Sequence, residues 1–402
     1  MGDTMNTSLK NSGIIFLFAI FFFGFFFMAC QKENVTSPID SSNVNTIDNQ
    51  YIIVLDPSAN DITLGNTTTA QVAKSILSEY NISSDNIKIV YEKVIKGFMA
   101  TLTPQAVQKL QLDKRVQYIE KDQLITINDV VESVNPKNNS IQAQTTPWGV
   151  TAVGGSVNAT SSTGVAWIVD TGIDLDHPDL NVNTSLSRTF VTTSPDNSSA
   201  DDLHGHGTHV AGIIAAKNNT IGSIGVCAGA TVIAVKVMNY RGSGTTSQIV
   251  NGLDYIGRNL VSGRLNVVNM SIGGSASTTL DNAVRTLAGY GAHICVAAGN
   301  SAIDCSTQSP ARVSATRVYT ISAFDNTGRF ASFSNYGSPI DYSAPGVSIY
   351  STYRNASYAT MSGTSMATPY ACGILLADDG SINWDGTVTN DRDSNPDEKA
   401  KR

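Results

Sequence analysis

The hydrophobic pattern near the amino terminus is a long apolar run that is followed by a polar segment. Residues 14–28 (IIFLFAIFFFGFFFM) form an unbroken apolar run of 15 residues behind a polar segment that carries one basic side chain, Lys10. A membrane span needs about 20 apolar residues, whereas the core of a signal peptide is shorter. We therefore predict a signal peptide over residues 1–30. Residues 31–50 are rich in Ser, Asn, Asp and Thr, which predicts a flexible stem.

A small domain is predicted over residues 51–127. Strand patterns occupy residues 51–55, 87–94, 98–102 and 116–119, and helical spacing occupies residues 69–80 and 104–110. Thr103-Pro104 provides an N-cap followed by proline at the first helical position. The order β-α-β-β-α-β is that of a small α+β ferredoxin-like domain. Residues 128–146 are polar and lack periodicity, so we predict a linker over residues 128–142.

After Pro147, short apolar runs alternate with helical segments. Strands are expected at residues 165–169, 231–238, 265–272, 292–298 and 318–324, and helices at residues 208–216, 247–259 and 279–290. This alternation predicts an α/β domain over residues 143–402, with a mostly parallel sheet flanked by helices and a polar acidic tail from about residue 378. Sites in such sheets form beyond the carboxyl ends of the strands.

Composition narrows the classes of protein. Of 402 residues, 41% are hydrophobic and 15% are charged, which excludes wholesale disorder and a coiled coil. A net charge of -7 argues against a nucleic-acid-binding protein. Five cysteines are too few for a disulfide scaffold, and the sequence cannot choose among the three pairings of Cys227, Cys295, Cys305 and Cys372. Cys295 lies in a predicted buried strand, which favours the role of a small hydrophobic residue.

Three residues at predicted strand ends and helix starts suggest acyl transfer. Asp170 closes a strand in WIVDTGIDLDHPDL, His206 begins a helix in DDLHGHGTHVAGIIAA, and Ser365 begins another in MSGTSMATPYACGILLA. This chemistry needs a hydroxyl nucleophile, an imidazole that takes its proton and a carboxylate that orients the imidazole. Asn300, in CVAAGNSA, and the backbone N–H of Ser365 could donate hydrogen bonds to the oxyanion.

The segments DTGID, HGTHVAG, AAGN and GTSMATP, in this order, resemble the subtilisin-like serine proteases of the subtilase (S8) family. The resemblance extends from about residue 143 to residue 377. It implies a serine endopeptidase that works through an acyl-enzyme: Asp170 orients, His206 is the general acid and base, Ser365 is the nucleophile, and Asn300 completes the oxyanion hole. The small domain, which ends in YIEKDQLITI, resembles the subtilase propeptide, a folding chaperone and temporary inhibitor.

Other classes fit the sequence less well. His204, His206 and His209 fall within six residues and suggest zinc, but no H-E-x-x-H pattern accompanies them. We expect His209 to be a hydrogen-bonding residue behind the site and His204 to be exposed. An α/β-hydrolase would need a G-x-S-x-G turn around Ser365. An inactive binding module would be plausible only if a triad residue were missing.

Two backbone-rich segments are candidates for substrate binding. An extended peptide could pair with them as an added strand, although ordinary loop glycines are the alternative. The family resemblance implies backbone binding by these segments and a pocket that favours apolar or aromatic side chains. The candidate residues are Gly242, Ser243, Gly244, Ser271, Ile272, Gly273 and Gly299.

The family resemblance also implies structural calcium and no organic cofactor. Ca²⁺ prefers six to eight oxygen ligands. The first implied site takes side chains of Gln144, Asp179 and Asn219 and carbonyls of Lys217, Ile221 and Ser223, and a second takes Asp341. In the tail, Asp391, Asp393, Asn395 and Asp397 are spaced like the start of an EF-hand loop, but Pro396 replaces the required glycine, and a solvated acidic end is the alternative.

Processing and location complete the sequence-based expectations. Phe27-Met28-Ala29-Cys30 resembles a bacterial lipoprotein cleavage site and predicts lipidation of Cys30; the alternative is an ordinary signal peptide with a bystander cysteine. AQTTPWGV resembles a mature subtilase start, which predicts self-cleavage between Gln142 and Ala143 before Gln144 can reach Asp179. We expect an exported bacterial monomer, secreted or on the outer surface or in the periplasm. Its partners are polypeptide substrates and its own propeptide, and it contacts membranes only through the signal peptide or a lipid anchor.

Overall fold

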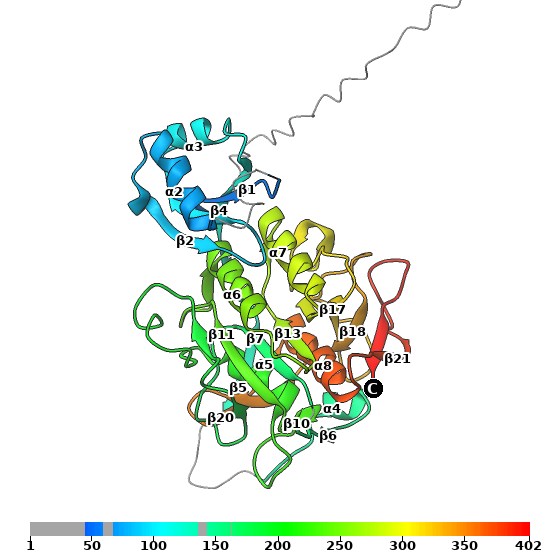
Figure 1. Cartoon of the computed structure of the whole chain (residues 1–402). Coiled ribbons are helices and arrows are strands. Elements are labelled where there is room, and N and C mark those ends of the chain that lie inside the picture. Colours follow the sequence, from blue (N-terminus) through cyan, green and yellow to red (C-terminus); the bar gives the residue numbers. More distant parts are fainter. Residues whose placement is uncertain (1–44, 59–66, 136–142, 162) are drawn as a thin grey trace, which may run out of the picture. The chain divides into compact units, whose positions relative to one another are not determined.

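A mostly parallel sheet forms the centre of the larger domain (Figure 1). From edge to edge its strands are β21 (Asn383–Thr387), β22 (Glu398–Lys401), β18 (Tyr342–Pro345), β17 (Val318–Phe324), β15 (His293–Ala297), β13 (Asn266–Met270), β7 (Val165–Asp170), β11 (Thr231–Lys236) and β8 (Asn181–Val182), with β9 (Arg188–Thr189) also pairing with β11. The five predicted strands are its consecutive members β17, β15, β13, β7 and β11. The predicted α/β fold class is therefore confirmed.

The computed structural model describes residues 45–58, 67–135, 143–161 and 163–402. The predicted signal peptide, Cys30, Gln142 and most of the predicted stem lie outside these residues. Within the described ranges, no helix is long and apolar enough to cross a membrane.

Helices cover both faces of the sheet because neighbouring residues of each strand point to opposite sides. In β7, Ala166 and Ile168 pack in one buried cluster, whereas Val165, Trp167 and Val169 pack in another. The first cluster includes α5 (His206–Ala215) and α8 (Thr364–Ala377), and the second includes α6 (Thr246–Asn259) and α7 (Thr278–Gly289). The short helix α4 (Trp148–Ala152) also contributes to the first.

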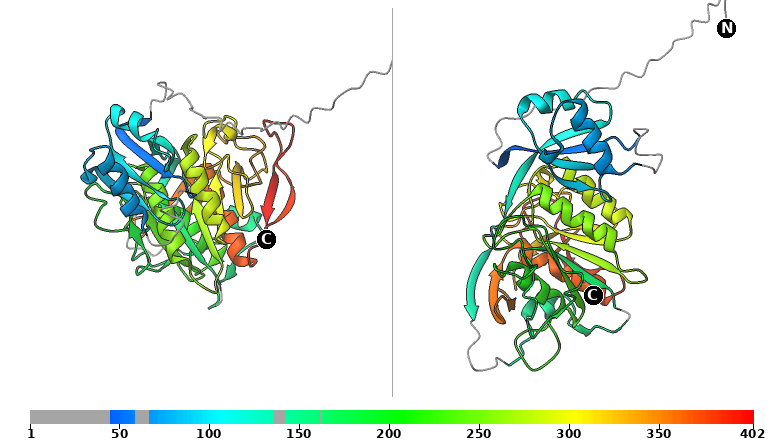
Figure 2. Two further views of the ribbon diagram at one scale, coloured as in Figure 1. Left: turned by 45° about the horizontal axis from the view of Figure 1, so that its top comes forward. Right: turned by 60° about the vertical axis from the view of Figure 1, so that its left-hand side comes forward.

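The predicted ferredoxin-like domain is present. Its elements are β1 (Thr46–Leu55), α2 (Thr69–Glu79), the 3₁₀ turn η1 (Ser84–Asn86), β2 (Ile87–Tyr91), β3 (Gly97–Thr101), α3 (Pro104–Leu110) and β4 (Val116–Thr126). Both helices pack on one face of the sheet (Figure 2). The other face, including Ile52, Val54 and Met99, belongs to the same buried cluster as α6 and α7. Thr103 caps α3 as predicted, its hydroxyl accepting the N–H of Ala106.

Smaller elements shape the rim of the larger domain. They are β6 (Val157–Asn158), β10 (Cys227–Ala228), β12 (Ser243–Thr245), β14 (Gly274–Ser275), η2 (Cys305–Thr307), β16 (Gln308–Ser309), β19 (Ile349–Tyr353) and β20 (Ser357–Ser362). β6 pairs with β10, β14 pairs with β16, and β19 pairs with β20.

Three sequence-based boundaries need correction. Strand β1 begins at Thr46, inside the predicted stem. The predicted linker contains β5 (Val130–Asn135), which pairs antiparallel with β20 although its own side chains lack a buried face. The tail is not simply a solvated acidic end, because β22 joins the sheet beside β18 and buries Ala400. Pairing with distant strands organised these polar segments, and a local pattern cannot predict such pairing.

Candidate active site

Asp170 and His206 meet where β7 ends and α5 begins. Both side chains are fully buried, and Asp170 Oδ1 lies 2.7 Å from His206 Nδ1. The same oxygen accepts the backbone N–H of Thr171, which fixes the orientation of the carboxylate. A buried carboxylate on Nδ1 holds the imidazole in one orientation and leaves Nε2 for a reacting group.

The start of α5 is held by a residue that the sequence analysis missed. One oxygen of Asp202 accepts the N–H groups of His204 and Gly205, and the other accepts the N–H and hydroxyl of Thr208. These bonds satisfy donors that a helix start leaves free. Gly205 has a φ of 111°, and a Cβ there would collide with the Tyr353 ring. The sequence signal was an aspartate four residues before His206, which also fits an ordinary loop.

Ser365 and Asn300 lie together at the start of α8. The Ser365 hydroxyl donates to the carbonyl of Ser271 (3.1 Å), and the Ser271 hydroxyl donates to the carbonyl of Ser365 (2.8 Å). Asn300 Oδ1 accepts the backbone N–H (2.8 Å) and the hydroxyl (2.9 Å) of Thr364. These two bonds occupy the amide oxygen and leave the Nδ2 donor of Asn300 for a ligand, as an oxyanion hole requires.

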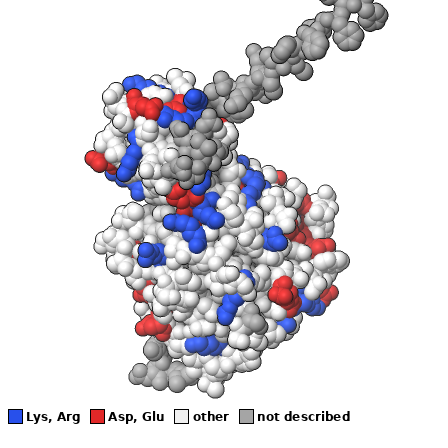
Figure 3. Space-filling view, in the orientation of Figure 1, with Lys and Arg blue, Asp and Glu red and all other residues white. Residues whose placement is uncertain are grey.

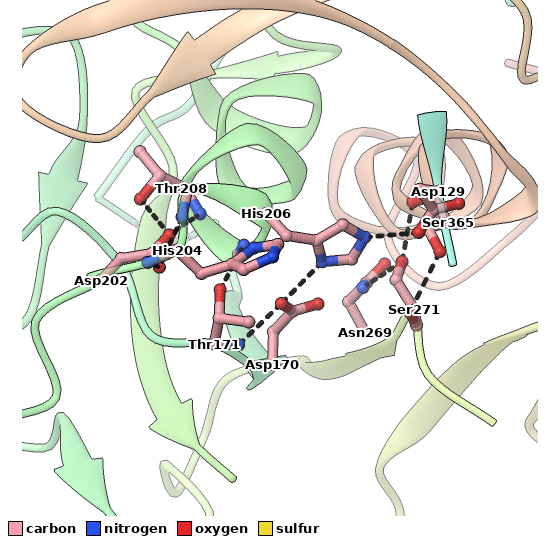
Figure 4. A network of polar contacts seen from close by, with 12 residues as sticks. Asp129, Asp170, Thr171, Asp202, His204, His206, Thr208, Asn269, Ser271 and Ser365 are labelled. Carbon is pink, nitrogen blue, oxygen red and sulfur yellow. Dashed lines mark hydrogen bonds and ion pairs between the residues drawn. The ribbon is translucent and has the colours of Figure 1, made fainter. Parts of the chain in front are cut away.

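A second unpredicted residue, Asp129, occupies the space between these groups. Figure 4 shows His206 between Asp170 on one side and Asp129 on the other, with Ser365 beyond. Asp129 Oδ2 lies 2.9 Å from His206 Nε2, and its Oδ1 accepts a hydrogen bond from Asn300 Nδ2 (2.8 Å). Only 2% of the Asp129 side chain is exposed. The sequence offered no signal beyond an acidic residue directly after the small domain.

The three neighbouring histidines have different electrostatic environments. Burial lowers the pKa of His206, but the carboxylates of Asp170 and Asp129 raise it by more, to about 10. Burial lowers the pKa of His209 to about 3, and its Nε2 contacts the carbonyls of Ile349 and Ala359, which confirms its predicted hydrogen-bonding role. His204 is half-buried instead of exposed, and burial lowers its pKa. In the described part of the chain, no group of three or more His, Cys, Asp or Glu side chains could hold a metal ion.

The predicted substrate segments line a cleft that the chain itself enters. This cleft, of about 360 Å³, is lined by Leu124–Asp129, Ser271–Ser275, Ala297–Ser301, Thr364 and Ser365, among others. Residues 124–126 of β4 pair antiparallel with β12, and the N–H of Ile127 donates to the carbonyl of Gly242. Of the predicted substrate residues, Ser271, Ile272, Gly273 and Gly299 line this cleft. Gly242, Ser243 and Gly244 do not line it, but their edge accepts residues 124–127 as an added strand.

Carboxylates fasten the small domain to helix starts of the larger one. Asp122 accepts the N–H and hydroxyl of Ser247 at the start of α6 (3.0 and 2.6 Å). Glu120 accepts the N–H and hydroxyl of Thr279 at the start of α7 (2.9 and 2.8 Å). In the other direction, Asp254 of α6 accepts three consecutive N–H groups, of residues 92–94. Each carboxylate therefore complements backbone donors that would otherwise remain unpaired.

The residues of the first implied calcium site converge. Asp179 accepts hydrogen bonds from the amide of Asn219 (2.7 Å) and the N–H of Ser223 (3.3 Å). The Gln144 amide donates to the carbonyls of Lys217 (2.8 Å) and Ser223 (3.3 Å). A half turn of the two amides would present their oxygens, so the set of one carboxylate, two amides and carbonyls fits a hard cation. Burial raises the pKa of Asp179 to about 6, and a bound cation would favour its charged form.

This arrangement corrects the expected order of events. Gln144 reaches the Asp179 loop while residues 124–129 lie in the cleft, and Ala143 pairs with Ile221, whose N–H donates to Asn219. The uncut chain therefore occupies the cleft and the loop at residues 217–223 at the same time, because residues 130–135 leave the cleft along β20.

The remaining candidates differ in outcome. Asp341 accepts the N–H of Thr320, and its predicted calcium role stays a prediction. The tail carboxylates do not form a metal site: Asp391 accepts the N–H of Asp397, and Asp393 accepts that of Asn395. Cys227, Cys295, Cys305 and Cys372 are all free and buried, and Cys295 lies in the sheet core as predicted.

The fold and this site define a serine hydrolase whose cleft is filled by its own amino-terminal domain. Residues 162–377 match the model of the subtilase family of peptidases, and residues 50–128 match the peptidase inhibitor I9 family. The chain therefore belongs to the subtilase family, and it is a serine endopeptidase with an inhibitor-type propeptide.

Named relatives agree with this assignment. M-protease of Shouchella clausii is 38% identical over 294 residues, which are 72% of this chain and 70% of that protein. The extracellular serine proteinase of a Thermus strain is 38% identical over 306 residues, 75% of this chain and 69% of that protein. The match to the crystal structure of a cold-adapted subtilisin-like serine proteinase has a TM-score of 0.50 and covers 57% of this chain and 84% of that one. The two sequences are 32% identical.

Proposed function

We propose that this endopeptidase is exported as a zymogen and hydrolyses peptide bonds through an acyl-enzyme on Ser365. The observation that carries the proposal is the arrangement of Asp170, His206, Ser365 and Asn300 around Asp129, beside the cleft in which an extended strand of the chain already lies (Figure 4). An extended polypeptide is therefore the class of ligand that fits the cleft.

The proposed reaction follows from the positions of the four groups. His206 takes the Ser365 proton at Nε2 while Asp170 holds Nδ1, and the Ser365 oxygen attacks the substrate carbonyl. Asn300 Nδ2 and the Ser365 backbone N–H donate to the oxyanion. His206 then returns the proton to the leaving amine, and water hydrolyses the acyl-enzyme by the same steps. This sequence requires that Asp129 has left Nε2.

Specificity should be broad because the edge around Gly242 and Gly244 recognises backbone groups. Ile272 and Gly299 line the cleft, which supports a preference for apolar or aromatic side chains. Calcium would be held by Asp179, Gln144, Asn219 and nearby carbonyls, and it would stabilise the loop at residues 217–223.

Export is supported by the apolar run at residues 14–28, and one relative is named as an extracellular enzyme. Cys30 would be the lipid attachment point, so the zymogen would be tethered before processing and the processed monomer released. On the face in Figure 3, basic and acidic side chains are interspersed.

Self-processing is proposed between Gln142 and Ala143. The mature-like segment is in place, because Ala143 pairs with Ile221 and Thr145 donates its N–H to the carbonyl of Gly222. Amino-terminal sequencing of the purified protein should find a start at Ala143 that is absent from the Ser365→Ala variant. The same start in that variant, made without active enzyme, would assign the cut to another protease.

The activity itself is tested with a peptide library and an active-site phosphonate probe. The processed wild type should cleave many sequences after apolar or aromatic residues and should bind the probe, whereas Ser365→Ala should do neither. Equal inactivity of the two proteins towards the library and the probe would overturn the proposed catalytic role of Ser365.

A further inference from the structure

Asp129 lies in neither of the two regions that match known families, since the inhibitor match ends at residue 128 and the peptidase match begins at residue 162. Its carboxylate nevertheless occupies the catalytic centre. One oxygen contacts the nitrogen of His206 that must accept the Ser365 proton, and the other accepts the amide donor of Asn300 reserved for the oxyanion. Because both contacts are made at once, neither group can serve the reaction while Asp129 is in place.

The nucleophile is disengaged in the same arrangement. The Ser365 hydroxyl donates to the Ser271 carbonyl, and its position beside His206 Nε2 is taken by Asp129. Gly363 allows this approach, because a Cβ at residue 363 would collide with Asp129 Oδ1. Two charge-assisted hydrogen bonds, made by a side chain of which only 2% is exposed, make the contact strong.

The chain on both sides of Asp129 is anchored. Before it, β4 pairs with β12; after it, β5 pairs with β20 over residues 130–135. Glu132 of β5 binds the hydroxyls of Ser348 and Ser362. These contacts fix the backbone around Asp129, so its short side chain needs little further ordering to reach the catalytic centre.

We propose that Asp129 is an inhibitory latch: its carboxylate holds the precursor inactive by bridging His206 and Asn300, separately from the inhibition supplied by the propeptide domain. The inference rests on the proposed function. The observed rate of self-processing is the rate of the open form multiplied by the fraction of molecules in which the latch is open. Any change that opens the latch should therefore accelerate processing.

The test follows self-processing of the full chain after refolding from denaturant. Asp129→Ala should process about ten- to a hundredfold faster than wild type, since two charge-assisted hydrogen bonds are lost. Asp129→Asn keeps the shape without the charge and should fall between the two. Asp85→Asn is the matched control, because it removes an exposed carboxylate of the small domain that lies in neither the blocking segment nor the triad, and it should process near the wild-type rate.

A second measurement does not depend on activity or on correct processing. In a Ser365→Ala background the chain stays uncut, and the pKa of His206 can be followed by NMR among only five histidines. Asp129→Asn should lower the pKa of His206 in that background, because one of the two neighbouring carboxylates loses its charge. Asp85→Asn should leave the pKa of His206 unchanged.

The latch is overturned if the Asp129 variants process at the wild-type rate or more slowly, or if the His206 pKa does not fall in the uncut chain. A variant that refolds poorly leaves the NMR result decisive. Inactivity of the processed wild type towards peptides would count against the proposed function instead, because the His206 measurement does not require hydrolysis.

Discussion

The catalytic groups and the segment that blocks them are positioned by different means. Asp170, His206 and Ser365 sit at the ends of buried elements, and at most 4% of each residue is exposed. The blocking segment, residues 120–129, is held by carboxylate contacts and by one strand edge. Core packing preserves the first arrangement after cleavage, whereas another extended peptide can replace the second. This difference is what a zymogen needs.

The largest expected effect concerns the proposed catalytic residues, which remain in place after cleavage. Ser365→Ala or His206→Ala should lower kcat by about 10⁶-fold, because the nucleophile and base act as a unit. Asn300→Ala should lower it by about 10²- to 10³-fold through loss of one oxyanion donor. Steady-state kinetics on a peptide substrate would measure these changes, with Ser301→Ala, an exposed serine in the same cleft, as the control. An unchanged kcat in Asn300→Ala would remove this residue from the oxyanion hole.

A smaller effect is expected in the blocking segment, which leaves the site after cleavage. Asp122→Ala leaves the N–H and hydroxyl of Ser247 without their partner. The cut propeptide should then dissociate about ten- to a hundredfold faster, as expected for loss of charge-assisted hydrogen bonds. The measurement is the lag between processing and the appearance of peptide hydrolysis. Asp48→Ala removes an exposed carboxylate of the same domain and should leave the lag unchanged. Equal lags for all three proteins would show that this helix cap does not retain the propeptide.

Removing calcium tests how the processed amino terminus is attached to the larger domain. If calcium is present at about 100 times its dissociation constant, its removal should cost about 2.7 kcal/mol, or about 5 to 10 °C in melting temperature. EDTA should lower the melting temperature of the processed enzyme, and Asp179→Ala should abolish that response. Asp341→Ala serves as the comparison and should retain most of it. A wild-type melting temperature insensitive to EDTA would contradict the proposed site.

An effect of similar size, confined to a narrow pH range, concerns Asp397 in the tail. Burial and the charges of Asp391 and Asp393 raise its pKa to about 7, although Ser322 donates a hydrogen bond to it. The native state therefore prefers the protonated form, and this stabilisation is complete below about pH 4 and is lost as the pH rises through about 7. Between pH 5 and pH 8, the free energy of unfolding of wild type should therefore fall by about 1 to 3 kcal/mol more than that of Asp397→Asn.

Denaturant unfolding of the Ser365→Ala protein at several pH values would measure this effect without self-digestion. Asp385→Asn, at an exposed position of the same tail, is the control. If wild type and Asp397→Asn lose the same stability between pH 5 and pH 8, titration of Asp397 does not weaken the tail.

Local patterns predicted the parts of the fold in which each strand or helix carries its own signal. The strand at residues 318–324 was predicted at its observed bounds, and Thr103 caps α3 because its hydroxyl and the following proline act within one turn. The short strands β5 and β22 were missed. β22 is polar and β5 exposes its three valines, so neither strand carries the alternating pattern of a half-buried strand. They form because they pair with the edges of β18 and β20.

The sequence by itself determined the family and the order of the domains, and it predicted Asp170, His206, Ser365 and Asn300 as the catalytic residues, because these residues lie in contiguous motifs beside strongly periodic elements. Only the tertiary structure decided that Asp129 lies against His206 and Asn300, 77 and 171 positions away in the chain. It also decided that Gln144 reaches the loop at residues 217–223, which contacts Asp179, before any cut. Such contacts depend on how distant segments pack, and no pattern within one segment encodes them.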